Sequence, residues 1–379
     1  MSHKIHYNTS QGNLIAGWSY ILSISGGIIL LLSGCSQTME VKEEEEQGSA
    51  TVPKVRQRLS NEEMNAMAGV GPDGIFGPND NFGRTINEAM QREPIANNGM
   101  RANHTNAKYG DHERNIFDLW NADTKAPAPL VVFIHGGGFR RGDKALIYNS
   151  DVLSDLLDAG ISVASINYRF GHQSPDGTLG SLRDTARFIQ FIRHHAKTYR
   201  IDKDKIACFG GSAGAVASLW LAFTDDMADP YSPDPISRES TRLACAGATS
   251  TPSTSDVLQW VDILGITREE AIGFSKALGR IDDETDLYSE EGIRTRKQTD
   301  LLRLMSADDP HIYIYNSETG ETPTHYGHMA HHPIHARVLK QRADELGIEA
   351  VVYAPEIGLV DPSGEDLVGF FIRQLKVGN

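Results

Sequence analysis

The sequence predicts an α/β fold in which a mostly parallel central sheet is flanked by helices. Continuous runs of β-branched and aromatic residues, such as residues 130–134, are typical of strands that are buried on both faces. Amphipathic segments such as residues 178–199 follow these runs, and this alternation implies parallel strands joined by right-handed crossovers. Roughly 270 of the 379 residues remain once the N-terminal region is set aside, which suits one large domain.

The alternation extends over residues 103–379, and it is interrupted at residues 255–306. This segment is polar, helix-prone and without a strand pattern, so we expect it to form a cap over a site at the edge of the sheet. The expected strands are residues 114–120 (at an edge), 130–134, 161–168, 205–209, 243–248, 312–315 and 348–353, and the expected helices are residues 144–159, 178–199, 213–223, 333–346 and 365–375.

The first 35 residues are expected to be a targeting segment. Lys4 lies in a weakly basic start, and residues 21–32 form an apolar run of about a dozen residues. This run is shorter than the about 20 residues that a membrane-spanning helix needs, and its length suits the core of a signal peptide. An uncleaved membrane anchor is the alternative.

The end of this run, Leu32-Ser33-Gly34-Cys35, resembles the lipobox of bacterial lipoproteins. The resemblance implies that Cys35 becomes the lipid-modified first residue of the mature protein and that Ser36 directs it to the outer membrane. Acyl chains would then hold the protein in the bacterial cell envelope while the rest of the chain stays in water. Residues 36–102 are expected to form a tether and N-terminal extension. The tether is expected over residues 36–60, because the glutamates at 43–46 repel one another and no apolar face is available there.

Charge and cysteine content narrow the range of functions. The formal net charge is −14, and such an acidic chain repels polyanions. This argues against nucleic acid or anionic lipid as the main partner. The three cysteines are too few for a disulfide framework. We therefore expect a small-molecule substrate and no nucleic-acid partner, while the sequence leaves the oligomeric state open.

The segment Gly210-Gly211-Ser212-Ala213-Gly214 is the first motif with chemical content. It lies between an expected strand and an expected helix, where a nucleophile on a tight, strained turn needs small neighbours. The turn exposes the hydroxyl of Ser212 at a helix N-terminus, whose dipole favours the anion that develops during attack. Ser212 is therefore the candidate nucleophile.

The segment His135-Gly136-Gly137-Gly138-Phe139 is the second motif, and it directly follows the expected strand at 130–134. Glycines allow backbone N–H groups to approach a substrate oxygen closely. Together with the amide of Ala213, the N–H groups of Gly137 and Gly138 are expected to form an oxyanion hole, which stabilises the transition state by several kcal/mol.

These two motifs, together with Asn167-Tyr168-Arg169, resemble the hormone-sensitive-lipase-like carboxylesterases. The resemblance covers roughly residues 105–250 and is much weaker beyond them. It implies an α/β-hydrolase fold and hydrolysis of short-chain or aryl carboxylic esters without a metal or organic cofactor. A location in the cell envelope suggests that the substrates are exogenous esters, such as acetylated or feruloylated polysaccharide fragments.

The general base that this resemblance implies is missing from its usual place. Such esterases carry an acid after the seventh strand and a histidine after the eighth, but the loop at 355–361 contains no histidine. A histidine cluster follows the strand at 312–315 instead, and we expect His332 or His331 to act as the base. The candidates for its orienting acid are Glu321, Glu318, Glu356 and Asp361.

Three alternatives stay open at this stage. The histidines could cap a helix, face solvent or bind a metal, although Pro333 interrupts their helical spacing and no metal is expected. A serine without a base would make the chain a catalytically impaired hydrolase that acts as a binding protein, and peptidase activity would use the same acyl-transfer groups. The aromatic residues that could line a substrate pocket, or equally pack in the core, are Tyr168, Phe139 and Trp260.

Overall fold

The computed structural model describes residues 81–376 of the chain. The expected signal segment over residues 1–35, its lipidation site Cys35, and most of the expected tether lie outside the described residues. Over the part that is described, no helix is long and apolar enough to cross a membrane.

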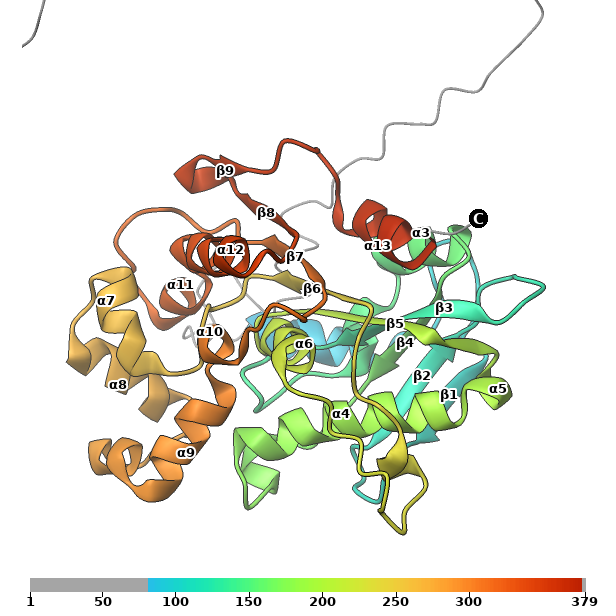
Figure 1. The fold of residues 1–379 in the computed structure, drawn as a ribbon, viewed down its shortest axis with the longest axis horizontal. Helices are drawn as coiled ribbons and strands as arrows, with labels where there is room; N and C mark the ends of the chain where they lie inside the picture. Colours follow the sequence, from blue (N-terminus) through green and yellow to red (C-terminus); the bar gives the residue numbers. More distant parts are fainter. Residues whose placement is uncertain (1–80, 377–379) are drawn as a thin grey trace, which may run out of the picture. The chain divides into compact units, whose positions relative to one another are not determined.

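The strands within residues 81–376 form a nine-stranded sheet in the order β1-β2-β4-β3-β5-β6-β7-β8-β9 (Figure 1). The six strands from β4 to β8 in this order pair in parallel, while β1, β2 and β9 pair antiparallel at the two sides. The predicted α/β fold with a mostly parallel sheet is therefore confirmed. The strand bounds are β1 His104–Lys108, β2 Ile116–Trp120, β3 Ala128–Ile134, β4 Ser162–Ile166, β5 Ile201–Gly211, β6 Cys245–Thr249, β7 His311–Tyr315, β8 Ala350–Ala354 and β9 Leu359–Val360.

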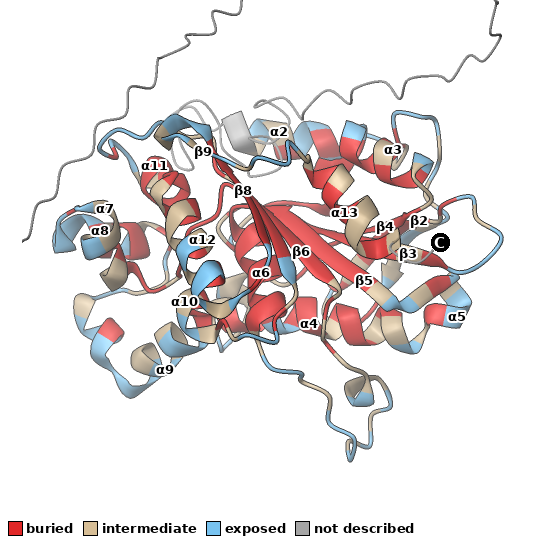
Figure 2. Cartoon of the chain, turned by 45° about the horizontal axis from the view of Figure 1, so that its top comes forward, coloured by how far each residue is buried: buried red, intermediate tan, exposed pale blue. Residues whose placement is uncertain are grey.

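Helices cover both faces of this sheet, and the central strands are buried between them (Figure 2). In β3, Leu130 and Val132 pack with side chains of α4 and α6, whereas Val131 and Phe133 pack with side chains of α3 and α13. This alternation of side chains is the two-residue period of a strand buried on both faces. The helix bounds are α2 Asn81–Met90, α3 Asp151–Asp158, α4 Thr178–His194, α5 Ala196–Tyr199, α6 Ala213–Phe223, α7 Trp260–Leu264, α8 Arg268–Ala277, α9 Glu290–Thr299, α10 Leu301–Leu304, α11 Tyr326–His331, α12 Ile334–Leu346 and α13 Leu367–Lys376.

Two of the expected elements differ in the structure. The strand expected at the sheet edge, over residues 114–120, is β2, and the polar strand β1 lies outside it. The single helix expected over residues 144–159 is a short 3₁₀ turn followed by α3, because Asn149 adopts a left-handed φ of 59°. Ser150 then caps the new helix by accepting a hydrogen bond from the N–H of Leu153.

Residues 257–304, between β6 and β7, fold into four helices and two 3₁₀ turns at one end of the sheet (Figure 1). We call this segment the cap. Its apolar side chains, including Trp260, Phe274 and Leu278, form a small core of their own. Met329 and Ala330 of α11 belong to the same core. The cap is thus packed directly against α11, the helix that ends at His331.

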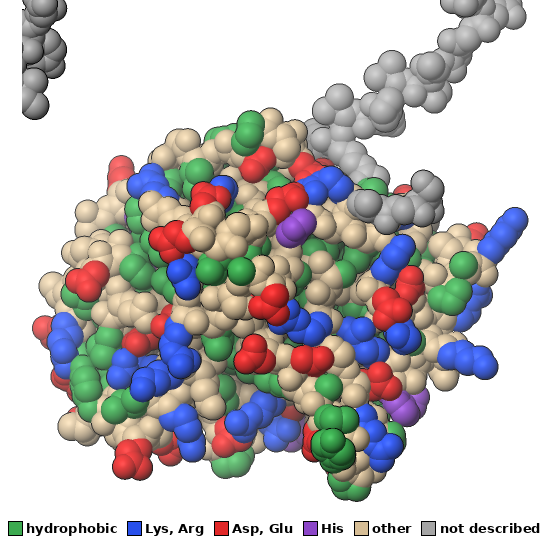
Figure 3. Space-filling model, viewed as in Figure 1, with side chains coloured by type: hydrophobic (Ala, Val, Ile, Leu, Met, Phe, Trp, Pro, Cys, Tyr) green, Lys and Arg blue, Asp and Glu red, His purple; other side chains and the backbone are tan. Residues whose placement is uncertain are grey.

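The surface in the view of Figure 3 carries acidic and basic side chains interspersed with one another. No single sign of charge dominates this face, although the whole chain has a formal net charge of −14. Charged side chains that line cavities are less screened by water than these surface charges, and so interact more strongly with a ligand.

Candidate active site

Ser212 occupies the turn between β5 and α6, and its backbone is strained. Its φ of 52° and ψ of −116° lie in a region that residues with a side chain rarely adopt. The glycines on either side permit the turn to approach β3. A Cβ on Gly210 would lie 2.2 Å from the carbonyl oxygen of Ile134, and a Cβ on Gly214 would lie 1.9 Å from the same oxygen. The backbone at Ser212 therefore has the tight strand-to-helix turn that a nucleophile elbow requires.

His331 is the histidine that meets the serine. Its Nε2 lies 2.8 Å from the Oγ of Ser212, which is within hydrogen-bond distance. Both side chains are buried, with exposed fractions of 0% for His331 and 6% for Ser212. His331 is the last residue of α11, so the end of that helix sets its position. Of the two expected bases, the structure brings His331 to Ser212 and directs His332 elsewhere.

Two further histidines of the cluster, His332 and His335, form hydrogen bonds to other groups within the protein. The Nε2 of His332 donates to the carbonyl oxygen of Glu321 at 3.0 Å, and its Nδ1 accepts from the N–H of Ile334. His335 bonds the hydroxyl of Ser253 through Nδ1 and the carbonyl oxygen of Met329 through Nε2. Within the described part of the chain, no group of three or more His, Cys, Asp or Glu residues is arranged to hold a metal ion.

Among residues 81–376, no carboxylate orients His331. Its Nδ1 is buried and has no hydrogen-bond partner there, so this part of the chain contains a Ser212–His331 pair without a third member. The expectation that Glu321 would be the orienting acid is wrong here, because its side chain is exposed and it is its backbone carbonyl that holds His332. The same unpartnered Nδ1 excludes hydrogen bonds from the remaining candidates, Glu318, Glu356 and Asp361.

Burial keeps His331 neutral. Removal from water lowers its pKa to about 3, and repulsion from the nearby histidines, led by His335, adds to this effect. To accept the proton of Ser212, the neutral ring must carry its own proton on Nδ1 and present a lone pair on Nε2. The ring is therefore in the charge state that a general base requires, but the Nδ1–H of the required tautomer has no acceptor to fix it.

The low pKa of His331 predicts an unusual pH profile. The neutral form is the base and exists above the pKa, so a pKa near 3 extends the active range to acid pH. We expect kcat/KM for p-nitrophenyl acetate to stay level from about pH 8 down to about pH 5, where a histidine of ordinary pKa would already be protonated. Circular dichroism at each pH would verify that the fold persists. A fall in kcat/KM centred near about pH 6.5 would contradict this prediction.

The glycines after β3 lie beside the serine turn because β3 and β5 are paired up to their ends, with Ile134 opposite Gly210. Gly137 and Gly138 have φ values of 107° and 65°, which glycine adopts without strain. Ala213 is the first residue of α6, so its N–H has no intrahelical partner. Gly138, Ala213 and Ser212 line the same small cavity.

Side chains behind this loop hold it in place. The hydroxyl of Tyr168 donates to the carbonyl oxygen of His135 at 2.7 Å, and the two rings stack with centroids 4.3 Å apart. Asn167 donates to Asp143 at 2.7 Å, and Arg169 forms an ion pair with buried Asp184 at 2.6 Å. Tyr168 therefore holds the start of the glycine loop, while Asn167 and Arg169 anchor the segment that carries it. Two roles were open for Tyr168, namely lining a substrate pocket or packing in the core. Its side chain is part of the hydrophobic core.

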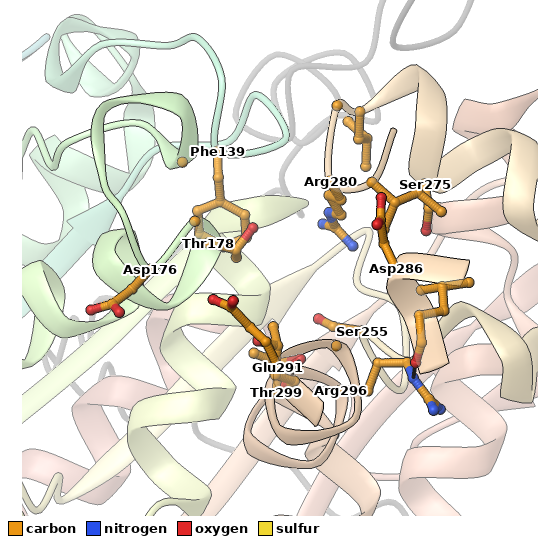
Figure 4. A pocket seen from close by; sticks show the side chains of 18 of the residues that line it. Phe139, Asp176, Thr178, Ser255, Ser275, Arg280, Asp286, Glu291, Arg296 and Thr299 are labelled. Carbon is orange, nitrogen blue, oxygen red and sulfur yellow. Dashed lines mark hydrogen bonds between the residues drawn. The ribbon is translucent and has the colours of Figure 1, made fainter. Parts of the chain in front are cut away.

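Two neighbouring cavities share the lining residues Gly138, Ser255, Leu278 and Arg280. The smaller, of about 20 Å³, is lined by Ser212 and by apolar residues that include Trp260, Phe274 and Leu278. The larger, of about 410 Å³, lies between the cap and the segments at 138–140 and 171–178, and it includes Phe139 (Figure 4). No sequence motif marks the cap residues of either cavity, because their positions depend on how the cap folds onto the sheet.

The comparison with protein families gives one match. The profile of the BD-FAE family, which is a family of α/β-hydrolase esterases, matches residues 117–317. This is more than half of the chain and includes the glycine loop and the serine turn. The match ends before α11, so it carries no information about the histidine.

Similar proteins with curated descriptions are esterases. Residues of this chain are 29% identical over 161 residues to a fumonisin B1 esterase from Sphingopyxis macrogoltabida, covering 39% of this chain and 29% of the esterase. They are 31% identical over 144 residues to a probable carboxylic ester hydrolase from Mycobacterium tuberculosis, covering 36% of this chain and 32% of the hydrolase. The alignments thus span only about a third of the length of these relatives.

Solved structures share the fold. A truncated carbohydrate esterase from gut microbiota aligns with a TM-score of 0.54 and 17% identity, covering 72% of this chain and 96% of that chain. A bifunctional GH43-CE protein of Bacteroides eggerthii aligns with a TM-score of 0.52 and 17% identity, covering 72% of this chain and 38% of that chain. At this level of identity, the comparison establishes the α/β-hydrolase architecture and nothing finer.

Proposed function

Because the chain belongs to the BD-FAE family of α/β-hydrolase esterases, we propose that it is a serine carboxylesterase that works through an acyl-enzyme on Ser212. The observation that carries this proposal is the 2.8 Å distance between the Oγ of Ser212 and the Nε2 of His331. Ser212 lines a cavity together with Gly138 of the glycine loop and lies at the N-terminus of α6, with His331 against its hydroxyl, which is the arrangement that acyl transfer requires.

Formation of the acyl-enzyme uses both residues. The Oγ of Ser212 attacks the ester carbonyl carbon while the Nε2 of His331 takes the hydroxyl proton. The negative charge that develops on the carbonyl oxygen is stabilised by the backbone N–H groups of Gly137, Gly138 and Ala213. When the tetrahedral intermediate collapses, the C–O bond to the alcohol breaks and His331 returns the proton to the leaving oxygen. Water then attacks the acyl-enzyme by the same route and releases the acid.

Among residues 81–376, the lack of a carboxylate that orients His331 limits the rate expected for this reaction. In serine proteases, replacing the acid of the triad lowers kcat by about 10⁴-fold, because the base adopts the wrong tautomer and its cation is unsupported. The Nδ1 of His331 is in a comparable situation. We therefore propose a slow hydrolase that favours esters with good leaving groups, since these need the least help from a proton donor.

Cavity sizes suggest which part of the ester lies where. A single water molecule needs about 10–15 Å³ of such space, so the cavity of about 20 Å³ at Ser212 admits only a very short acyl chain. The cavity of about 410 Å³ is large enough for a sugar-sized alcohol. We therefore propose acetyl esters of a larger alcohol as substrates. The carbohydrate esterase among the similar folds is in keeping with a sugar as that alcohol.

Hydrolysis of p-nitrophenyl acetate and p-nitrophenyl butyrate by the full-length protein tests this function. We expect p-nitrophenyl acetate to be cleaved faster than p-nitrophenyl butyrate by about tenfold or more, because the longer butyryl chain does not fit beside Ser212. Phenylmethylsulfonyl fluoride should modify Ser212 alone, which peptide mass spectrometry can locate. Hydrolysis that continues after sulfonylation of Ser212, or a preference for butyrate, would refute the proposal.

The second candidate is a catalytically impaired hydrolase that binds a ligand in the cell envelope. The unpartnered Nδ1 of His331 is the observation that favours it. Absence of both hydrolysis and a Ser212 adduct in the same experiment would support this candidate. The retained contact between Ser212 and His331 favours the enzyme, because a binding protein has no need of it.

The location of the protein is a separate proposal that rests on sequence alone. We propose that residues 1–35 are a lipoprotein signal peptide and that Cys35 carries the lipid, which would attach the enzyme to the outer membrane. The narrower assignment to the hormone-sensitive-lipase-like esterases is likewise a proposal, supported by the glycine motif at 135–139 and the serine motif at 210–214.

A further inference from the structure

Arg280 lies where the two cavities of the active site meet. It lines the small cavity with Ser212 and also the larger cavity under the cap. Figure 4 shows its guanidinium pointing into the larger cavity, across from Phe139. Its backbone is fixed by a hydrogen bond from its N–H to the carbonyl oxygen of Ser275. A group of the substrate that extends from the serine into the larger cavity must therefore pass Arg280.

This guanidinium has no anionic partner among residues 81–376. Its Nε is buried without a hydrogen bond, and the ring centroid of Phe274 lies 5.8 Å from the guanidinium carbon. Burial lowers its pKa to about 10, so it is still cationic at neutral pH. Arg296, which also lines the larger cavity, is different because it forms an ion pair with Asp256 at 2.8 Å.

Four carboxylates line the larger cavity, namely Asp176, Asp282, Asp286 and Glu291, and none of them forms an ion pair with Arg280. Asp176 pairs with Arg183, Glu291 lies 3.9 Å from Arg294, and Asp286 accepts hydrogen bonds from the backbone N–H groups of residues 282 and 283. None of the acidic residues that line the larger cavity also lines the small cavity at Ser212. Among the described residues that line the small cavity at Ser212, Arg280 is the one charged side chain, and it is partly buried. A partly buried cation without a counter-ion is costly unless a ligand compensates it.

We propose that Arg280 binds a carboxylate on the alcohol part of the substrate, so that the enzyme acts on acetyl esters of acidic alcohols such as sugar acids. A guanidinium and a carboxylate can form two parallel hydrogen bonds, which would also orient the ester toward Ser212. The side chain is placed for this role because it separates the space for the acyl group from the space for the alcohol. This inference rests on the proposed esterase function.

Two matched esters test the proposal, namely 4-acetoxybenzoate and the neutral 4-acetoxybenzamide, with the full-length protein and its Arg280→Met variant. We expect the variant to lower kcat/KM for the benzoate by about 10- to 100-fold, as for loss of a hydrogen bond to a charged group, and for the benzamide by less than about threefold. Arg280→Lys should keep part of the preference for the benzoate. Arg268→Met, which removes an exposed cap arginine, should change neither rate.

An equal fall in both rates, or no fall in either, would overturn the proposal, since Arg280 would then support only the cap or have no role. Binding separates this result from failure of the proposed function. In a Ser212→Ala background, 4-hydroxybenzoate should bind at least about tenfold more tightly than 4-hydroxybenzamide, and Arg280→Met should remove the difference. This measurement holds even if no ester is cleaved, and equal affinities would reject a carboxylate site at Arg280.

Discussion

Replacing Ser212 by alanine is expected to abolish ester hydrolysis, with a fall in kcat of about 10⁴- to 10⁶-fold, as for nucleophiles in other serine hydrolases. The Oγ of Ser212 is the atom that would attack, and its hydrogen bond within the described structure is to the Nε2 of His331. Alanine retains the Cβ, so the strain at φ 52° is unchanged and the fold should be preserved. Initial rates with p-nitrophenyl acetate, alongside thermal unfolding of both proteins, would measure the two effects.

Ser218→Ala provides a matched control for this variant. Ser218 is another buried serine of the same region, and its hydroxyl bonds the carbonyl oxygen of Gly214 within α6 rather than a catalytic group. Its replacement should leave kcat within a few-fold of the parent protein. A Ser212→Ala protein that keeps more than about a tenth of the activity would show that hydrolysis does not proceed through this serine.

Replacing His331 by alanine is expected to lower kcat by about 10³- to 10⁶-fold, because Ser212 would lose its proton acceptor. His332→Ala is the matched control, since that ring bonds the carbonyl oxygen of Glu321 and the N–H of Ile334. We expect it to retain at least about a tenth of the parent kcat. The same assay with p-nitrophenyl acetate would compare the two variants.

The double variant sharpens this prediction. Because a nucleophile and its base act as a unit, Ser212→Ala combined with His331→Ala should be no slower than the slower single variant. Losses that multiply would mean that His331 acts independently of the serine. A larger loss in His332→Ala than in His331→Ala would assign the base to the other histidine and contradict the geometry of α11.

The fold could be predicted wherever the hydrophobic pattern is local and strong. Residues 130–134 are apolar throughout and form the end of a central strand, as expected. The polar strand β1 was not predicted, because an exposed edge strand needs no apolar face. The break between residues 144–147 and α3 was also missed, since it depends on one left-handed residue, Asn149, that no sequence pattern marks.

The site could be predicted only in part for a similar reason. The motifs around Gly137 and Ser212 are contiguous in sequence and bring their own backbone geometry, so they could be recognised directly. The choice between His331 and His332 depends on where α11 ends, and neighbouring residues at a helix end point in different directions. Arg280 could not be identified, because its unpaired state results from how the cap packs on α11 and the sheet.

The position of the cap in the chain has a consequence for how new specificities could arise. Both ends of the cap join neighbouring parallel strands, β6 and β7, so all of it lies between Ser212 and His331 in sequence. Recombination of a single gene segment could therefore exchange the cap side of both cavities while the sheet side and the strand register stay unchanged. Met329 and Ala330 complete the apolar core of the cap, so a functional exchange must carry this part of α11 with it. Substrate preference and the placement of the base would then be inherited together.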